Sequence, residues 1–194
     1  MISIQNQKQY YLAVSPLGNE WLQTYHPEET TMTFTFLNNQ PEEFLAILRQ
    51  VGQWLIDNDQ TLWQLDNLIA NKLFDEYTLG NCYVMYADQL PAATFILQWK
   101  DPLYYADVPD NTAGFIHKVA IRRAFAGQGL FAPMLDFCQK QCLARNIHQL
   151  QLETDATRPS LMRFYERHGF EPTYQKNIHE FGQTFHCQYY ALQF

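Results

Sequence analysis

The stretch "IRRAFAGQGLFAPML" at residues 121–135 decides how this chain is organised. Two glycines, Gly127 and Gly129, separate an apolar run typical of a strand from a run typical of a helix. Glycines just before a helix bring bare backbone N–H groups and the positive end of the helix dipole within reach of an anion. The loop therefore either only turns the chain or holds a phosphate, and this stretch alone leaves both interpretations open.

Strand and helix patterns alternate on both sides of this loop. Pro41 and two acids precede apolar residues on one helical face, which predicts a helix at 41–57, and a second helix is predicted at 61–74. The same periodicities predict helices at 130–146 and 159–170, strands at 31–36, 81–88, 92–99, 114–121 and 148–154, and late strands near 171–176 and 184–194. The crossover unit 114–154 predicts one parallel pair in a mixed, mainly antiparallel sheet flanked by helices.

Two segments together resemble the GCN5-related N-acetyltransferase (GNAT) superfamily. "VAIRRAFAGQGLFAPML" is similar to its strand followed by R/Q-x-x-G-x-G/A and a helix, and "YERHGF", Tyr165 to Phe170, is similar to its Y-x-x-x-G-F helix. The order of elements from about residue 31 onward is also similar. The resemblance implies an α/β fold, in its α+β mixed-sheet form, whose parallel strands splay apart. We expect a GNAT domain at 31–194 and an N-terminal extension at 1–30 that packs on it.

The resemblance also implies acetyl-CoA as co-substrate. Its pantetheine arm would pair with the backbone of the first parallel strand, and its diphosphate would rest on the amides of the glycine loop. The coenzyme-binding residues are then Val119, Ala120, Ile121, Ala126, Gly127, Gln128, Gly129, Leu130, Phe131 and Arg158. The chain departs from the family pattern at Ala126, where Arg or Gln is usual, at Phe131, where Gly or Ala is usual, and at Arg158, where Asn is common. Arg122, Arg123 or Arg158 could replace the missing loop charge.

Two residues are the catalytic candidates. Tyr165 matches the position of the family's acid, which protonates the departing thiolate; the alternative is a packed helix aromatic. An alkylamine is mostly protonated at pH 7, so a base or a water relay helps, and His117 on the 114–121 strand is the sharpest candidate. His117 could equally be hydrogen-bonded inside the sheet. Glu153 is a weaker candidate base, and Asp101 either binds a cationic acceptor or only forms a turn in "KDP".

Composition narrows the classes of function. The net charge of −7 argues against a nucleic-acid partner, because such proteins carry a basic face. The chain has no run near the roughly 20 apolar residues of a membrane span and no signal-peptide pattern at its start. The four cysteines have no metal-ligand spacing, and Cys138 and Cys142 read as buried thiols. We therefore expect a cytoplasmic protein without a metal or a membrane partner; a homodimer stays open, since many relatives dimerise.

These observations favour an N-acetyltransferase that acts on the primary amine of a small molecule by direct attack. Two alternatives stay open: acetylation of a protein or peptide amine, and a non-catalytic acyl-CoA-binding module. Large aromatic residues either shape the acceptor pocket or form core, and the candidates are Trp54, Trp63, Trp99, Tyr104 and Tyr105.

Overall fold

A seven-stranded mixed sheet forms the centre of the computed structural model, which describes residues 32–180 and 183–194. The strand order is β1-β2-β3-β4-β5-β7-β6. The strands are β1 (Phe34–Asn38), β2 (Cys82–Ala87), β3 (Leu90–Gln98), β4 (Gly114–Ile121), β5 (Gln149–Asp155), β6 (Glu171–Glu180) and β7 (Gln183–Gln193). The helices are α1 (Pro41–Asp57), α2 (Ala70–Glu76), α3 (Phe131–Leu143) and α4 (Pro159–Arg167), with 3-10 turns η1 (Leu65–Asn67), η2 (Leu79–Asn81) and η3 (Arg123–Phe125). The expected extension at 1–30 lies outside the described residues.

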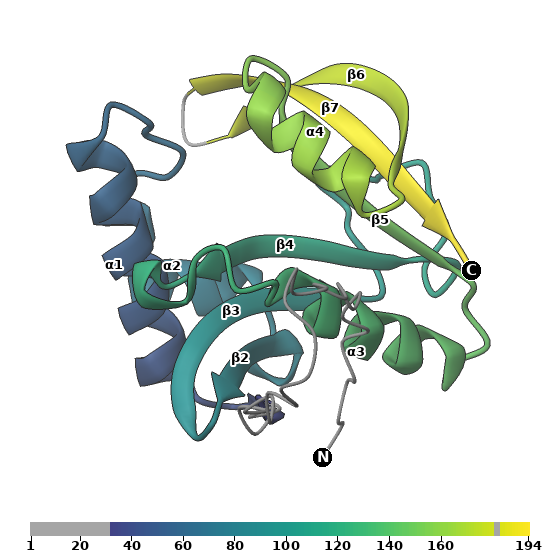
Figure 1. The fold of residues 1–194 in the computed structure, drawn as a ribbon. Helices are drawn as coiled ribbons and strands as arrows, with labels where there is room; N and C mark the ends of the chain where they lie inside the picture. Colours follow the sequence, from purple (N-terminus) through teal and green to yellow (C-terminus); the bar gives the residue numbers. More distant parts are fainter. Residues whose placement is uncertain (1–31, 181–182) are drawn as a thin grey trace, which may run out of the picture.

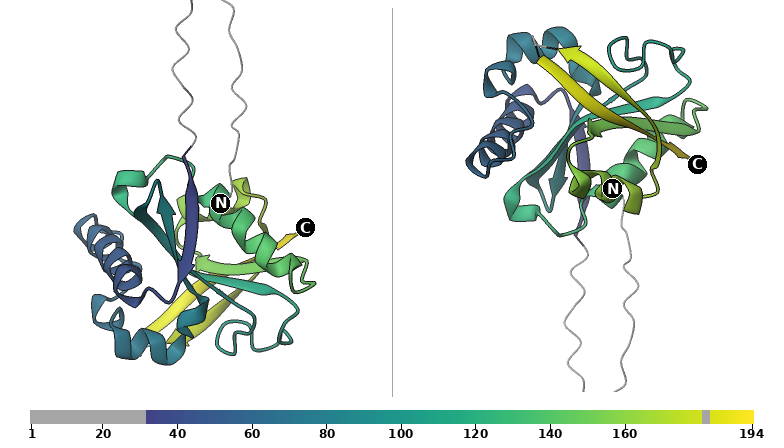
Figure 2. Two further views of the ribbon diagram at one scale, coloured as in Figure 1. Left: turned by 90° about the horizontal axis from the view of Figure 1, so that it is seen from below. Right: turned by 90° about the horizontal axis from the view of Figure 1, so that it is seen from above.

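Helices cover both faces of the β1–β4 part of the sheet (Figure 2). α1 begins at Pro41, whose missing N–H is not needed in a first turn, and Glu42 and Glu43 complement the helix dipole there. Its apolar stripe, which includes Phe44, Ile47 and Leu48, packs with α2 on one face. α3 packs on the opposite face, where Cys138 and Cys142 are buried free thiols, as the sequence predicts.

The helix predicted at 61–74 is wrong in extent. The chain forms η1 and the short helix α2 instead, with extended backbone at Gln64 and Ile69. The physical reason is a tertiary contact, because Arg49 on α1 donates hydrogen bonds to the carbonyls of Leu65 and Leu68 at 2.9 and 3.1 Å. These are carbonyls that a continuous helix would bond internally. Packing against α1 thus overrides the helical periodicity.

The one parallel pair, β4 with β5, opens soon after it begins (Figure 1). Only Gly114 with Leu150 and Phe115 with Gln151 are in register, which confirms the predicted parallel crossover and its splay. A bulge in β4 accompanies the opening: Ile96 pairs with His117 and Thr94 with Ala120, so two residues of β4 oppose one of β3. Lys118 lies in this bulge with φ of 51°. Regular alternation along β4 therefore ends at His117.

Candidate active site

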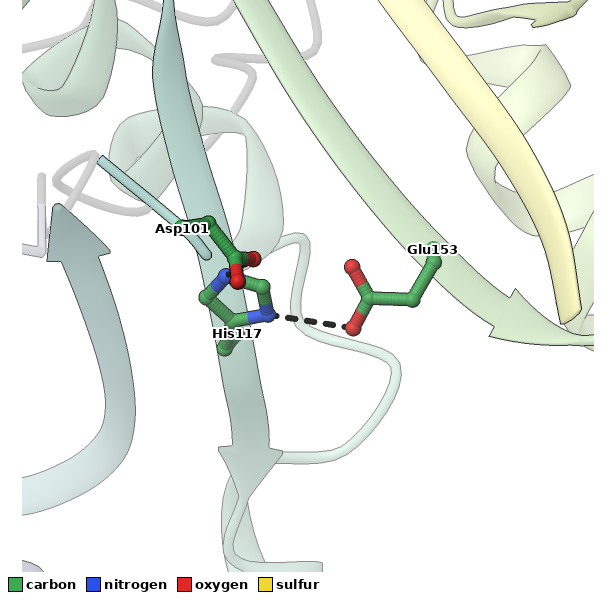
Figure 3. A group of neighbouring side chains, drawn as sticks. All are labelled: Asp101, His117 and Glu153. Atoms are coloured by element: carbon green, nitrogen blue, oxygen red, sulfur yellow. Dashed lines mark hydrogen bonds and ion pairs between the residues drawn. The ribbon is translucent and has the colours of Figure 1, made fainter. Parts of the chain in front are cut away.

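Three ionisable side chains meet where β4 and β5 begin to diverge (Figure 3). His117 extends from β4, Glu153 from β5, and Asp101 from the loop after β3. The His117 Nδ1 lies 3.0 Å from Glu153 Oε1 in a hydrogen bond, and its Nε2 lies 3.0 Å from Asp101 Oδ2. The second contact has the distance of an ion pair but lies off the hydrogen-bond direction. His117 is thus bracketed by two carboxylates.

Asp101 forms the turn that its sequence context predicts and also faces His117, a contact that the sequence does not predict. Its Oδ1 accepts the backbone amides of Leu103 and Tyr104 at 3.1 and 2.9 Å, which forms the turn expected of "KDP". Its Oδ2 faces His117. Burial alone would raise the pKa of Asp101, but the close contact and charge of His117 and the hydrogen bonds from the two amides outweigh burial and lower it. Asp101 is therefore an ionised partner of His117.

The imidazole of His117 carries a positive charge in this environment. Burial alone would lower the pKa of His117, but the charges of Glu153 and Asp101 and its close contacts with both outweigh burial and raise it to about 10. His117 then holds a proton on each ring nitrogen at neutral pH. One metal ion could bond only one of these nitrogens, whereas the two carboxylates face opposite ones, so the geometry suits a shared imidazolium better than a metal.

Glu153 is the most accessible member of the group. Its side chain is 12% exposed, against 2% for His117 and 3% for Asp101. Glu153 Oε1 accepts the His117 hydrogen bond, whereas Oε2 is buried and has no partner among the described residues. An unpaired buried carboxylate oxygen is costly, so Oε2 retains capacity for a donor such as an ammonium group.

Tyr165 of α4 lies near the same group. It is 8% exposed and packs beside Phe131, Phe170 and Tyr190. Burial, and next the charge of Glu153, raise the pKa of the Tyr165 phenol well above its ordinary value. The hydroxyl therefore keeps its proton at neutral pH and is available as a donor.

Two adjoining cavities lie along the opening between the strands. The first, of about 280 Å³, is lined by His117, Glu153 and Tyr165, so the candidate catalytic residues share one space. The second, of about 730 Å³, runs beside the outer half of β4 and is lined by residues that include Val119, Ala120, Ile121 and Arg158. Leu62, Trp63, Val119 and Leu161 line both cavities. The predicted catalytic and pantetheine-binding residues thus line one continuous groove.

The glycine loop has the conformation that its sequence requires. Gly127 and Gly129 have φ of 76° and 77°, where other residues are strained, and nothing lies within 4 Å of a Cβ at either position. Within the described residues, no backbone carbonyl accepts the amides of Gly127, Gly129, Leu130 or Phe131. The Phe131 ring, the departure from the family pattern, points into the core and is 2% exposed. The loop therefore presents bare, unpaired amides at the start of α3, as a phosphate cradle needs.

Arginines line the second cavity. Arg123 stacks on Trp54, with its guanidinium carbon 4.1 Å from the ring centroid. Nη2 of Arg158 donates hydrogen bonds to the carbonyls of Gln60 and Thr61, and Nε pairs with Asp155 at 3.1 Å. Two of its three guanidinium nitrogens therefore already have partners. Arg167 also lines this cavity. Nothing in the sequence singles out Arg167, because a lone arginine on a helix carries no signal of a site.

The five large aromatic candidates divide between groove and core. Trp63 and Tyr104 line the first cavity and Trp54 the second. Tyr105 packs on Phe115 in the core. Trp99 stacks with Arg145 at 4.1 Å. The sequence also gives no sign that Asp101 and Glu153 share one histidine, because this contact depends on the sheet register.

The splayed parallel pair in a mixed sheet and the glycine loop match the fold expected of the GNAT acetyltransferases, and comparisons with known proteins agree. The sequence profile of the acetyltransferase (GNAT) family matches residues 19–170. The chain belongs to this family. GNAT enzymes use acetyl-CoA as co-substrate, and the chain is an acyltransferase of this kind. The profile begins inside the stretch assigned to the N-terminal extension, whose boundary stays a prediction.

Relatives and structures with a similar fold carry related descriptions. YesJ of Bacillus subtilis, described as an uncharacterized N-acetyltransferase, is 26% identical over 137 residues, which cover 67% of this chain and 76% of YesJ. A GNAT-family acetyltransferase from Listeria monocytogenes is similar in fold, with a TM-score of 0.64 and 18% identity over 83% of this chain and 95% of its own. The ribosomal-protein-S18-alanine N-acetyltransferase of Escherichia coli is also similar in fold, with a TM-score of 0.56 and 16% identity over 83% of this chain and 94% of its own. Within the described residues, no helix is long and apolar enough to cross a membrane.

Proposed function

We propose that this protein transfers the acetyl group of acetyl-CoA to the primary amine of a small molecule by direct attack. The observation that carries the proposal is the Asp101–His117–Glu153 group at the opening of the sheet, whose His117 and Glu153 line one cavity with Tyr165. The group offers an acceptor for the proton of an amine, and the phenol offers a donor for a thiolate. Direct transfer needs both.

The groove has features that fit the coenzyme. The bare amides of the glycine loop would hold its diphosphate, with Arg123 and Arg158 as nearby cations. The β4 backbone at Val119, Ala120 and Ile121 has no register partner on β5, so it would pair with the pantetheine arm as a strand edge does. The bound coenzyme supplies an activated thioester. The protein's own residues would orient the coenzyme and transfer the protons.

The amine would lose its proton to the His117–Glu153 pair. His117 holds a proton at each nitrogen, so the atom with free capacity is Glu153 Oε2, and His117 acts through Glu153 by fixing its other oxygen at 3.0 Å. The proposal thus extends the role expected of His117 to a pair in which Glu153 accepts the proton. The amine becomes neutral and nucleophilic at the moment it meets the thioester.

The departing thiolate would be stabilised by Tyr165. A thiolate has an ordinary pKa near 8.5 for its acid, so it gains from a donor in a buried site. The Tyr165 hydroxyl stays protonated because burial and Glu153 raise its pKa. Removal of this hydroxyl alone should therefore slow turnover without loss of coenzyme binding.

The size of the first cavity supports a small acceptor. Ligand pockets of proteins commonly measure about 300–1,000 Å³. A space of about 280 Å³ lies just below that range and suits a compact amine. The peptide alternative would need a longer open groove past Glu153.

The test is release of free thiol from acetyl-CoA with a panel of small primary amines and a panel of peptides with free N-termini. We expect turnover with small amines, and a fall in kcat of roughly 10²–10⁴-fold for Tyr165→Phe. Tyr190→Phe is the matched control, because it removes a tyrosine hydroxyl that bonds Glu166 and does not line either cavity. Tight acetyl-CoA binding without turnover would favour the non-catalytic module, and turnover of peptides alone would favour the peptide enzyme.

A further inference from the structure

We propose that the acceptor is an amine with an apolar body and no carboxylate on its reactive carbon, so that free α-amino acids are rejected. This inference rests on the proposed function and names its substrate class. It follows from the charge at the inner end of the first cavity and from the residues that form its walls.

The inner end of the cavity carries one net negative charge. Asp101 and Glu153 are carboxylates, and His117 between them is one cation that lies 3.0 Å from each. Glu153 lines the cavity and has one oxygen without a partner among the described residues. An ammonium group placed there neutralises the group and satisfies that oxygen.

Among the described residues, the lining of the first cavity has one cation besides His117 that could receive a carboxylate. Arg158 does not line this cavity; its Nε pairs with Asp155 and its Nη2 bonds two carbonyls. Lys118 is the other cation in the lining, and its Nζ lies 5.7 Å from the centroid of the Tyr77 ring. The lining therefore offers Lys118 as the one candidate carboxylate partner among the described residues.

An α-amino acid fits this charge pattern poorly. Its carboxylate is attached to the same carbon as its amine, so an amine seated at Glu153 brings a second negative charge against Glu153 and Asp101. Like charges at such separations repel strongly in a partly buried site, because little water screens them. An ammonium group without an adjacent carboxylate is attracted to Glu153 and Asp101 and brings no such repulsion.

The walls of the cavity are mostly apolar. They include Trp63, Leu68, Leu73, Tyr104, Leu161 and Phe185. A hydrocarbon or aromatic body would bury its surface against these side chains, and a second charge on the body would lose its hydration there. The walls therefore favour amines such as phenethylamine, tyramine and isopentylamine as probes.

The experiment compares each probe with the amino acid that differs from it by one carboxylate: phenethylamine with phenylalanine, tyramine with tyrosine, and isopentylamine with leucine. With acetyl-CoA as donor, we expect kcat/KM for each amine to exceed that for its partner by at least about a hundredfold. A ratio within about threefold, or a preference for the amino acid, would overturn the inference. So would acetylation of peptides or diamines with none of the three amines accepted, although the proposed function would then stand. Failure to acetylate any amine would refute both.

Binding to variants in the presence of CoA provides a second readout. Glu153→Gln removes the net charge, so the preference for tyramine over tyrosine should shrink at least about tenfold in Kd, whatever happens to turnover. Lys118→Met is the control: it should leave the ratio unchanged. An unchanged ratio in Glu153→Gln, or a selective loss of tyrosine binding in Lys118→Met, would show that a cation, and not the carboxylate pair, decides specificity.

Discussion

Replacement of His117 by Gln should change the pH dependence of stability in a defined way. The folded-state pKa of His117 is raised to about 10 by its two carboxylates, against an ordinary value of 6.5. A group whose pKa is higher in the folded state than in the unfolded state stabilises the folded state fully at pH values below its unfolded-state pKa. That stabilisation is lost as the pH rises through the folded-state pKa. The window of loss is therefore about pH 6.5–10.

The magnitude follows from the same two values. Each pH unit of separation corresponds to about 1.4 kcal/mol, so the group contributes on the order of 5 kcal/mol below pH 6.5. Removal of one partner of a buried ion pair costs about 3–5 kcal/mol, a similar size. In His117→Gln the two carboxylates face each other without a cation, so acid, which protonates one of them, should restore part of the loss. The stability difference between wild type and variant should be largest near pH 6 and fall on both sides.

Urea unfolding of wild type and His117→Gln at pH 5–9.5 measures this difference. His179→Gln, which replaces an exposed histidine, is the control for general effects of histidine loss and should show no such maximum. Nitrogen NMR of the wild-type imidazole should show both nitrogens protonated at pH 8. A flat stability difference between pH 6.5 and 9.5, or an imidazole that titrates near 6.5, would refute the assignment of His117 as a buried imidazolium.

The coenzyme site gives two further predictions. Acetyl-CoA at a hundredfold excess over its Kd should stabilise the protein against thermal unfolding by about 2.7 kcal/mol. Gly127→Asp should abolish this stabilisation, whereas Gly127→Asn, which tolerates the same φ without the charge, should retain most of it. An equal loss in both variants would mean that the shape of the side chain, and not its charge, prevents binding. At least one of Arg122→Ala, Arg123→Ala and Arg158→Ala should lower coenzyme affinity, with a difference that shrinks as salt is added. Unchanged affinity in all three would leave the loop amides as the only phosphate ligands.

Local patterns in the sequence were sufficient for most of the fold. The helix at 41–57 and the strand at 114–121 have the predicted bounds, because apolar periodicity and first-turn residues act within each segment. The glycine loop also follows from its own residues, since φ near 76° is open to glycine and costly for most others. The helix predicted at 61–74 failed because Arg49 on another element takes its carbonyls.

The candidate site is where the tertiary structure decided what the sequence could not. The sequence nominated His117, Tyr165, Glu153 and Asp101 separately, each with a structural alternative. Whether they meet depends on the register of β4 with β5, which places His117 and Glu153 two residues beyond the last parallel pairs, and on the turn that brings Asp101 to the opposite nitrogen. The charge of His117 follows from that meeting, because a histidine's pKa is set by the groups that surround it in space and not by its neighbours along the chain.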